Sequence, residues 1–294
     1  MATALSAAGL RITKLNPVLG ARVEGIDLRQ PVDAATAARL RDALAEHIVL
    51  NFPDQPLTQE QQLRFAQVFG KVSARSRPDA IRAEAADPYV NSAVMLVSNI
   101  RNEKGEPIGS LPDGEMWFHQ DMVFVEVPNS ATMLNAIEIP STGGNTKFVS
   151  LYRAWEGTPE RIRRRIEGRR ALQTFNYHMV GRFDPAETGV SQPNLRQAWQ
   201  PAVVTHPVTG RKALMVNRLM TVRIEGLPED ESRGILDELY PIIEDPAGLY
   251  EHVWSVDDLL IWDNLASAHA RTDFPPTERR LLRRLMIQGQ KLSV

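Results

Sequence analysis

Apolar residues along this chain fall mostly into short runs, and the length and spacing of these runs predict the secondary structure. Short apolar runs bounded by turn residues indicate buried strands rather than helices. Such runs predict strands within 10–28, at 48–52 and at 131–139, 146–149, 213–217, 258–262 and 281–288. The chain is therefore expected to be rich in short strands.

Helical spacing of apolar residues is confined to a few segments, which are 33–47, 58–69, 158–167 and 228–243. Thr58 with Gln61 three positions later predicts a capping box at the start of the second helix. Thr158 followed by Pro159 predicts an N-cap and a proline at the first helical position of the third. Helices thus gather near the start of the chain and in insertions between strands.

This order of elements predicts a mainly β fold with flanking helices, built on a double-stranded β-helix, the jelly-roll and cupin-like core. The chain has no internal repeat and no low-complexity linker, so we expect one domain over residues 1–294. Two long segments without clear periodicity, at about 75–114 and 177–200, are expected to be active-site loops.

The amino-acid composition limits the kinds of active site that the chain can have. The chain has no cysteine, which excludes disulfides, zinc–thiolate sites, iron–sulfur clusters and a cysteine nucleophile. Any metal must then be held by histidine and carboxylate side chains. A formal charge of -2 favours neither a nucleic acid nor an anionic membrane as partner. No secretory signal or membrane-spanning run is expected, so the predicted location is the cytoplasm.

One histidine among the six has a carboxylate two positions away. His119 and Asp121 would leave the same face of a strand, and a histidine beside a carboxylate supplies two corners of a facial metal-binding triad. This short motif alone is weak, because an ordinary histidine–carboxylate pair has the same spacing.

The C-terminal region offers a third corner and a cluster of positive charge. His269 follows the apolar strand predicted at 258–262, and four arginines stand between positions 279 and 284. With strand periodicity, Arg280 and Arg284 share one face and Arg283 lies on the other. The cluster fits a solvated strand edge equally well. If one pair faces the barrel interior, however, each buried guanidinium needs a carboxylate, which a dicarboxylic co-substrate would supply.

Taken together in their order, these motifs resemble the taurine dioxygenase and 2,4-dichlorophenoxyacetate dioxygenase family of iron(II)/2-oxoglutarate enzymes. The resemblance covers nearly the full chain. It rests on segments 19–28, 61–70, 117–121 and 140–146, on 206–211 with 216–217, and on 262–264 with His269 and the double-arginine strand.

The resemblance implies a role for each matching residue. His119, Asp121 and His269 would bind Fe(II), and O2 would be the oxidant. Thr146 and Arg284 would hold the distal carboxylate of 2-oxoglutarate, and Arg280 would lie near its other carboxylate. The expected reaction is hydroxylation of a small organic substrate with release of succinate and CO2. Halogenation is disfavoured, because related halogenases have a small residue in the place of Asp121.

The substrate is expected to be a small organic anion, as is common in the family. Matching the motifs outward places a set of residues near the substrate pocket: Arg75, Glu115, Tyr177, His178, Met179 and Met220. Glu115 stands where taurine-specific members have an amide, and a carboxylate there would repel a sulfonate, so taurine is not the expected substrate.

Two alternatives stay open at this level. The same iron site could carry out desaturation, epimerisation or cyclisation, since only substrate placement differs. A jelly-roll binding protein without turnover is the other alternative, although it has no need of the Thr146, Arg280 and Arg284 set. The family also favours a homo-oligomer, either a dimer or a tetramer.

Overall fold

The largest element of the structure is a seven-stranded sheet. A computed structural model describes residues 9–74, 93–110, 114–174 and 196–294. Strands in this sheet are antiparallel except for the parallel pair β2 and β3. Their spatial order is β1 (Arg11–Lys14), β2 (Ala21–Glu24), β3 (Val49–Phe52), β14 (Leu259–Asp263), β6 (Ala131–Glu138), β16 (Leu281–Ile287) and β4 (Met95–Ser98). The strands predicted near the C-terminus therefore lie on both sides of β6, in the interior of the sheet.

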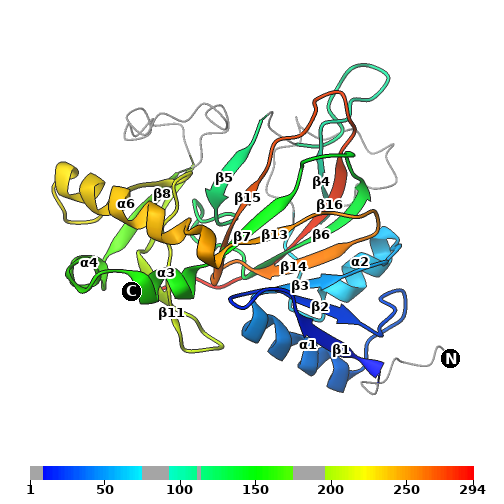
Figure 1. Ribbon diagram of the computed structural model, residues 1–294, viewed down its shortest axis with the longest axis horizontal. Helices are drawn as coiled ribbons and strands as arrows, with labels where there is room; N and C mark the ends of the chain where they lie inside the picture. The colour runs from blue at the N-terminus through cyan, green and yellow to red at the C-terminus, as the bar shows by residue number, and fades with distance from the viewer. Residues whose placement is uncertain (1–8, 75–92, 111–113, 175–195) are drawn as a thin grey trace.

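A four-stranded antiparallel sheet forms the second wall of the β core (Figure 1). Its order is β13 (Tyr250–His252), β7 (Thr146–Ser150), β15 (Ser267–Arg271) and β5 (Met116–His119). Side chains of the two sheets meet, since the rings of Trp262 on β14 and His269 on β15 lie 4.7 Å apart. The two sheets with their flanking helices form the predicted jelly roll.

The remaining described elements lie around these two sheets. Helices α1 (Ala34–His47) and α2 (Gln59–Ala66) lie beside the large sheet, whereas α3 (Leu151–Gly157), α4 (Glu160–Ile166) and α6 (Glu229–Ile243) gather at the other end of the molecule (Figure 1). The short strands and the 3-10 helix there are β8 (Arg170–Thr174), β9 (Gln197–Pro201), β10 (Val203–Thr205), β11 (Lys212–Leu214), β12 (Thr221–Ile224) and η4 (Pro246–Gly248).

The large sheet separates two clusters of buried apolar residues, and its strand β16 contributes side chains to both. Leu282 belongs to the cluster between the sheets and the α3, α4 and α6 layer, whereas Leu281 and Leu285 belong to the cluster under α1 and α2. Because successive side chains of a strand point to opposite faces, Arg284 shares the inner face with Leu282. Arg283 lies on the outer face, where it donates to Asn135 Oδ1 at 2.6 Å and to the Leu57 carbonyl.

The capping box predicted for α2 is confirmed, and the N-cap predicted at Thr158 is wrong. The capping box of α2 is present, with Thr58 and Gln61 bonded in both directions, and Asp33 caps α1. Thr158 instead closes the preceding helix, since its hydroxyl donates to the Ala154 carbonyl, and α4 begins after Pro159. The segments expected to be irregular contain β4 and β9, because pairing with β16 and with β8 outweighs weak local periodicity.

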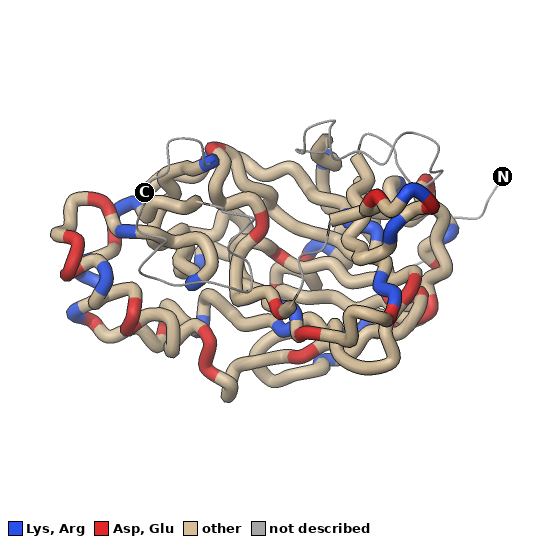
Figure 2. The backbone as a smooth tube through the Cα atoms, turned by 90° about the horizontal axis from the view of Figure 1, so that it is seen from above, with Lys and Arg blue, Asp and Glu red and all other residues tan. Residues whose placement is uncertain are grey.

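Charged residues of both signs are interspersed along the chain (Figure 2). On α4 and α6, ion pairs link Arg161 to Glu238 and Arg165 to Glu231. Among the described residues, no helix combines the length and apolar character that a membrane span requires.

Candidate active site

Two strands from distant parts of the sequence bring the three predicted ligands together. β5 and β15 pair antiparallel, with His119 opposite His269, and Asp121 follows β5 by two residues. One ligand atom from each of the three residues lies within 4.8 Å of the others, and all three side chains are buried. Two imidazoles and one carboxylate in this arrangement fit a metal held on one face, with coordination positions left for other ligands.

Both imidazoles are held in the neutral form that a metal ligand requires. His119 Nδ1 lies 2.8 Å from the Trp117 carbonyl, which can only accept, so Nδ1 carries the hydrogen and Nε2 keeps its lone pair. Burial lowers the pKa of His119, and burial with the nearby His119 lowers that of His269 to about 3.

Asp121 is fixed by contacts to its carboxylate and to its backbone. Its Oδ2 accepts from Thr132 Oγ1 at 2.6 Å and its Oδ1 from Arg284 Nη1 at 3.2 Å. Asn264 clamps the backbone, accepting from Asp121 N at 2.7 Å and donating to Asp121 O at 2.8 Å. Burial alone raises the pKa of Asp121, but the Arg284 guanidinium and the imidazoles outweigh it and hold the pKa below its usual value. The carboxylate is therefore ionised and oriented.

Two polar residues, Thr146 and Arg271, lie beyond the metal ligands on the same sheet face. Arg271 is two residues beyond His269 on β15 and lies opposite Thr146 on β7. Directly paired residues of antiparallel strands project from the same face, so Thr146 and Arg271 share the face of His269. Trp254 Nε1 donates to Thr146 Oγ1 at 3.0 Å. Since an indole N–H only donates, the hydrogen of the Thr146 hydroxyl remains available for another acceptor.

Arg280 lies against the turn that leads into Thr146. Its Nη2 donates to the Gly144 carbonyl at 3.1 Å. A Cβ on Gly144 would come within 3.1 Å of Arg280 Nε, and the φ of +66° also favours glycine. Arg280 is 2% exposed, and its Nε and Nη1 have no hydrogen-bond partner among the described residues. Burial, with the charge of Arg271, lowers the pKa of Arg280 to about 9. A buried cation of this kind fits an anionic ligand.

Comparison with known proteins places this geometry in a family. The model described as taurine catabolism dioxygenase TauD, TfdA family, matches residues 11–286. The alpha-ketoglutarate-dependent 2,4-dichlorophenoxyacetate dioxygenase of Cupriavidus pinatubonensis is 31% identical over 280 residues, covering 92% of this chain and 94% of the relative. The chain belongs to the TauD, TfdA family.

Solved structures similar to this one superimpose over almost the whole chain. A putative alpha-ketoglutarate-dependent taurine dioxygenase from Burkholderia xenovorans has a TM-score of 0.77 at 26% identity, covering 96% of this chain and 93% of that one. AAD-2 in complex with Mn(II) and N-oxalylglycine has a TM-score of 0.75 at 25% identity, covering 97% of this chain and 99% of that one. The resemblance inferred from the motifs is confirmed. The chain is a 2-oxoglutarate-dependent dioxygenase, and its His119, Asp121 and His269 set is consistent with Fe(II).

The residues predicted to line the substrate pocket are only partly described. Glu115 is exposed, and its Oε1 accepts from Trp117 Nε1 at 3.1 Å. Met220 is buried in the core beside β12, where its N–H donates to Asn217 Oδ1, and no described contact joins it to the metal ligands. The other four, Arg75, Tyr177, His178 and Met179, lie outside the described residues.

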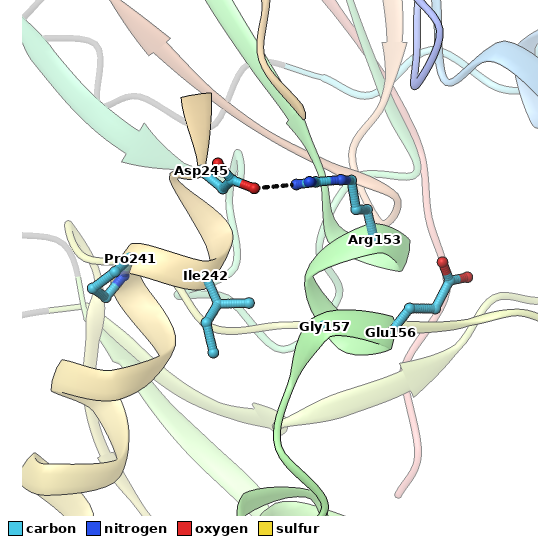
Figure 3. A pocket seen from close by; sticks show the side chains of 6 residues that line it. All are labelled: Arg153, Glu156, Gly157, Pro241, Ile242 and Asp245. Atoms are coloured by element: carbon cyan, nitrogen blue, oxygen red, sulfur yellow. Dashed lines mark hydrogen bonds and ion pairs between the residues drawn. The ribbon is translucent and has the colours of Figure 1, made fainter. Parts of the chain in front are cut away.

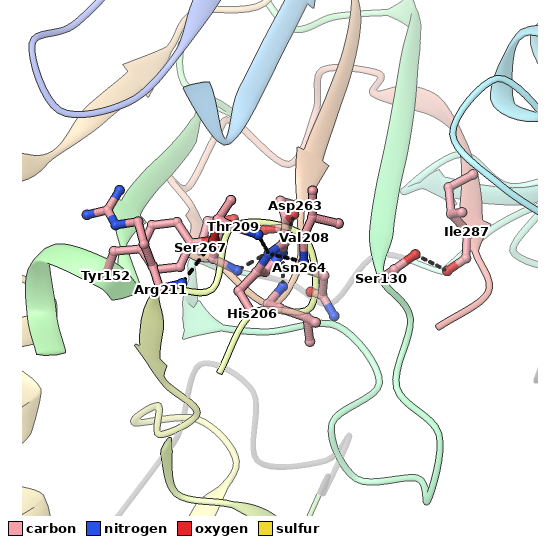
Figure 4. A network of polar contacts seen from close by, with 12 residues as sticks. Ser130, Tyr152, His206, Val208, Thr209, Arg211, Asp263, Asn264, Ser267 and Ile287 are labelled. Carbon is pink, nitrogen blue, oxygen red and sulfur yellow. Dashed lines mark hydrogen bonds and ion pairs between the residues drawn. The ribbon is translucent and has the colours of Figure 1, made fainter. Parts of the chain in front are cut away.

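A buried network supports the turn that leads into β15 (Figure 4). His206 Nδ1 accepts from the N–H groups of Val208 and Thr209, so its Nε2 carries the hydrogen and donates to Asp263 Oδ2 at 2.9 Å. Asp263 Oδ1 accepts in turn from the N–H groups of Leu265 and Ala266. His206 therefore acts through Asp263 on the strand that carries the third metal ligand.

A surface hollow of about 470 Å³ lies apart from this chemistry, between α3 and α6 (Figure 3). Arg153 and Asp245 form an ion pair of 2.7 Å across it. None of the three metal ligands lines the hollow. The active site is therefore assigned from the ligand cluster between the sheets.

The hydroxyl of Thr132 provides a test of how the carboxylate ligand is held. Thr132→Val keeps the shape of the side chain but removes the hydrogen bond to Asp121. We expect Mn(II) affinity to fall about 10- to 100-fold, the usual effect of losing a group that orients a metal ligand. Isothermal titration with Mn(II) measures this, with Thr205→Val on the exposed face of β10 as the control. Unchanged affinity in Thr132→Val would contradict this role.

Proposed function

We propose that this dioxygenase hydroxylates a small organic anion, with Fe(II) held by His119, Asp121 and His269. The observation that carries the proposal is the arrangement of charge around the ligands. Arg284 contacts the ligand Asp121, whereas Arg280 and Thr146 lie further along the sheet. One site thus has separate positions for two anionic groups.

The positions of the arginines favour an exchange of the roles that the resemblance implied for them. Arg280 contacts Gly144, two residues before Thr146, so Arg280 and Thr146 together suit the distal carboxylate of 2-oxoglutarate. A planar guanidinium and a donating hydroxyl orient a carboxylate as well as bind it. Arg284 is beside Asp121 and suits an anionic group close to the metal, which we assign to the substrate.

His119, Asp121 and His269 would hold Fe(II), which would supply O2 activation coupled to the oxidative decarboxylation of 2-oxoglutarate to succinate and CO2, while the chain orients the reactants and shields them from water. Thr132 and Asn264 fix the direction of the Asp121 carboxylate. The rings of Phe148 and Trp262 lie 6.1 and 4.7 Å from the His269 ring and form an apolar wall behind it. Such a wall limits side reactions of a strong oxidant with water.

The choice of an anion rests on the balance of charge. Arg284 contacts the ligand Asp121, the buried Arg280 has two guanidinium nitrogens without a hydrogen-bond partner among the described residues, and a divalent metal would add to the positive charge. The 2-oxoglutarate dianion neutralises only part of this. A substrate carboxylate, sulfate ester or related anion beside Arg284 would offset more of it. Because Glu115, which accepts a hydrogen bond from Trp117, stands where taurine-specific members have an amide, taurine serves as the disfavoured member of a substrate panel.

Succinate formation tests the proposal. The protein is supplied with Fe(II), 2-oxoglutarate and O2, and succinate is measured with and without aryloxyalkanoates, alkyl sulfate esters, sulfonates and neutral analogues. We expect an anion, but not its neutral amide or ester analogue, to stimulate succinate release. Stimulation by neutral compounds alone would overturn the substrate class.

Mass analysis of the product separates hydroxylation from the alternatives at the same site. Hydroxylation adds one oxygen atom to the substrate, whereas desaturation or cyclisation removes two hydrogen atoms and epimerisation leaves the mass unchanged. We expect the gain of oxygen. The dimer or tetramer, the single domain and the cytoplasmic location stay predictions of the sequence, and light scattering of the purified protein measures the first.

A further inference from the structure

A buried tryptophan contacts one of the residues that we assign to the distal carboxylate of the co-substrate. Trp254 is 5% exposed, and its Nε1 donates to Thr146 Oγ1 at 3.0 Å. The two residues are 108 positions apart, so the packing of the sheets creates this contact and no local turn does. The function proposed above uses the Thr146 hydroxyl but gives the indole no role.

The hydrogen bond limits what the Thr146 hydroxyl can do. A threonine hydroxyl has one hydrogen and two lone pairs, and it rotates to donate or to accept. An indole N–H only donates, so Trp254 occupies a lone pair of Oγ1 and leaves the hydrogen for another partner. None of the described residues accepts that hydrogen. A hydroxyl that accepts one hydrogen bond also becomes a stronger donor of its own hydrogen.

Contacts on both sides of Trp254 in the chain keep the indole in place. The His252 ring packs edge-to-face against the Trp254 ring, with the ring centroids 4.7 Å apart. His252 Nδ1 lies 3.1 Å from the Tyr250 hydroxyl, and its Nε2 lies 3.0 Å from Asp258 Oδ2. The same carboxylate oxygen accepts from the Ser255 N–H at 2.9 Å. Asp258 thus holds a residue before Trp254 and the residue after it.

We propose that Trp254 is a positioning residue for the co-substrate, and that its N–H orients Thr146 Oγ1 so that the hydroxyl donates to the distal carboxylate of 2-oxoglutarate. The inference rests on the proposed assignment of Thr146 to that carboxylate. A donor whose direction is fixed before the ligand arrives loses less conformational entropy on binding. Such a donor binds only a group that can accept, so Trp254 favours 2-oxo acids with an anionic distal end.

Calorimetry with two ligands tests this role without turnover. N-oxalylglycine carries the distal carboxylate, whereas N-ethyloxamate has a methyl group in its place. Both are titrated into the Mn(II)-loaded wild type and into the Mn(II)-loaded Trp254→Phe, Thr146→Val and double variants. We expect N-oxalylglycine to bind Trp254→Phe about 3- to 10-fold more weakly and Thr146→Val about 10- to 100-fold more weakly. N-ethyloxamate should bind all four proteins within about twofold.

The double variant shows whether the tryptophan acts through the threonine. Without the hydroxyl, the indole N–H has nothing to orient, so the double variant should bind N-oxalylglycine within about twofold of Thr146→Val. Independent contributions of the two residues would multiply instead. Trp155→Phe is the matched control, because it replaces another buried tryptophan, whose ring packs against Arg163 and Lys212, and it is expected to change neither affinity.

A second replacement applies if Trp254→Phe fails to fold or to hold Mn(II). The amino acid 3-benzothienylalanine at position 254 keeps the two fused rings and has sulfur in place of the N–H. It gives the same comparison of the two ligands with the shape of the side chain retained.

Each outcome has a different meaning. Equal weakening of both ligands by Trp254→Phe would mean that the indole only supports the fold, and multiplied effects in the double variant would also overturn the proposal. A weakened Thr146→Val beside an unaffected Trp254→Phe would overturn this inference alone. If Thr146→Val binds N-oxalylglycine as tightly as the wild type, the proposed role of Thr146 is wrong and the inference is wrong with it.

Discussion

Asp121→Ala is expected to reduce iron-dependent succinate formation to the level of a protein-free control. The variant leaves two imidazoles, which provide no negative charge for a divalent ion. It also leaves Arg284, whose Nη1 lies 3.2 Å from Asp121 Oδ1, without that carboxylate. The guanidinium then repels the metal across a buried site, where like charges interact strongly. Loss of one ligand and one negative charge should therefore prevent both metal binding and turnover.

Two measurements on the variant separate loss of the metal from loss of the fold. Mn(II) titration should show no binding at the affinity of the wild type, and circular dichroism should show an unchanged fold. Asp42→Ala is the matched control, because Asp42 is an exposed aspartate on α1. Full succinate formation by Asp121→Ala would exclude the metal assignment, and a wild-type level in His269→Ala would do the same.

The metal ligands were predictable because each depends on a short-range rule. Alternation along a strand places His119 and Asp121 together, and an apolar strand followed by a histidine points to His269. What the residues alone could not show is that β5 and β15 are neighbours. That pairing joins positions 150 residues apart and is set by the packing of both sheets. The ordered motifs of the family supplied this information instead.

The residues that were not predicted from the sequence also act on partners that are distant in the sequence. Trp254 donates to Thr146, which lies more than 100 positions earlier, Arg271 lies opposite Thr146 on the paired strand, and Asn264 acts on the backbone of Asp121. The spacing of His269 and Arg271 was a usable signal, since residues two apart on a strand share a face. The N-cap predicted at Thr158 is wrong for a local reason. A threonine between two helices can cap the end of the first helix or the start of the second.

The two inner-face arginines show how a correct pattern leaves a role undetermined. Alternation predicts that Arg280 and Arg284 share a face, and the contacts agree, with Arg283 on the other side. Four strand residues, however, span about 13 Å along the backbone, and the two guanidiniums have different partners, Gly144 and Asp121. They therefore suit different anionic groups, and only their contacts with Gly144 and Asp121 show which end of the site each one occupies.

Arg280→Leu is expected to raise the KM for 2-oxoglutarate about 100-fold or more, with a much smaller change in the KM for the primary substrate. Removal of one partner from a buried charged pair costs about 2–5 kcal/mol, because the other charge is left unpaired. Each 1.4 kcal/mol is a factor of ten, so even the lower value changes affinity by more than tenfold. Since Arg280 is 2% exposed, water cannot replace the guanidinium readily.

Arg279→Leu is the matched control, because the Arg279 side chain is 63% exposed and pairs with Glu138 at the surface. Exposed ion pairs contribute little, so both KM values should stay near those of the wild type. Arg284→Leu should give the opposite pattern to Arg280→Leu, raising the KM for the primary anion more than that for 2-oxoglutarate. If Arg284→Leu affected 2-oxoglutarate more than Arg280→Leu does, the roles implied by the resemblance would stand and the exchange would be wrong.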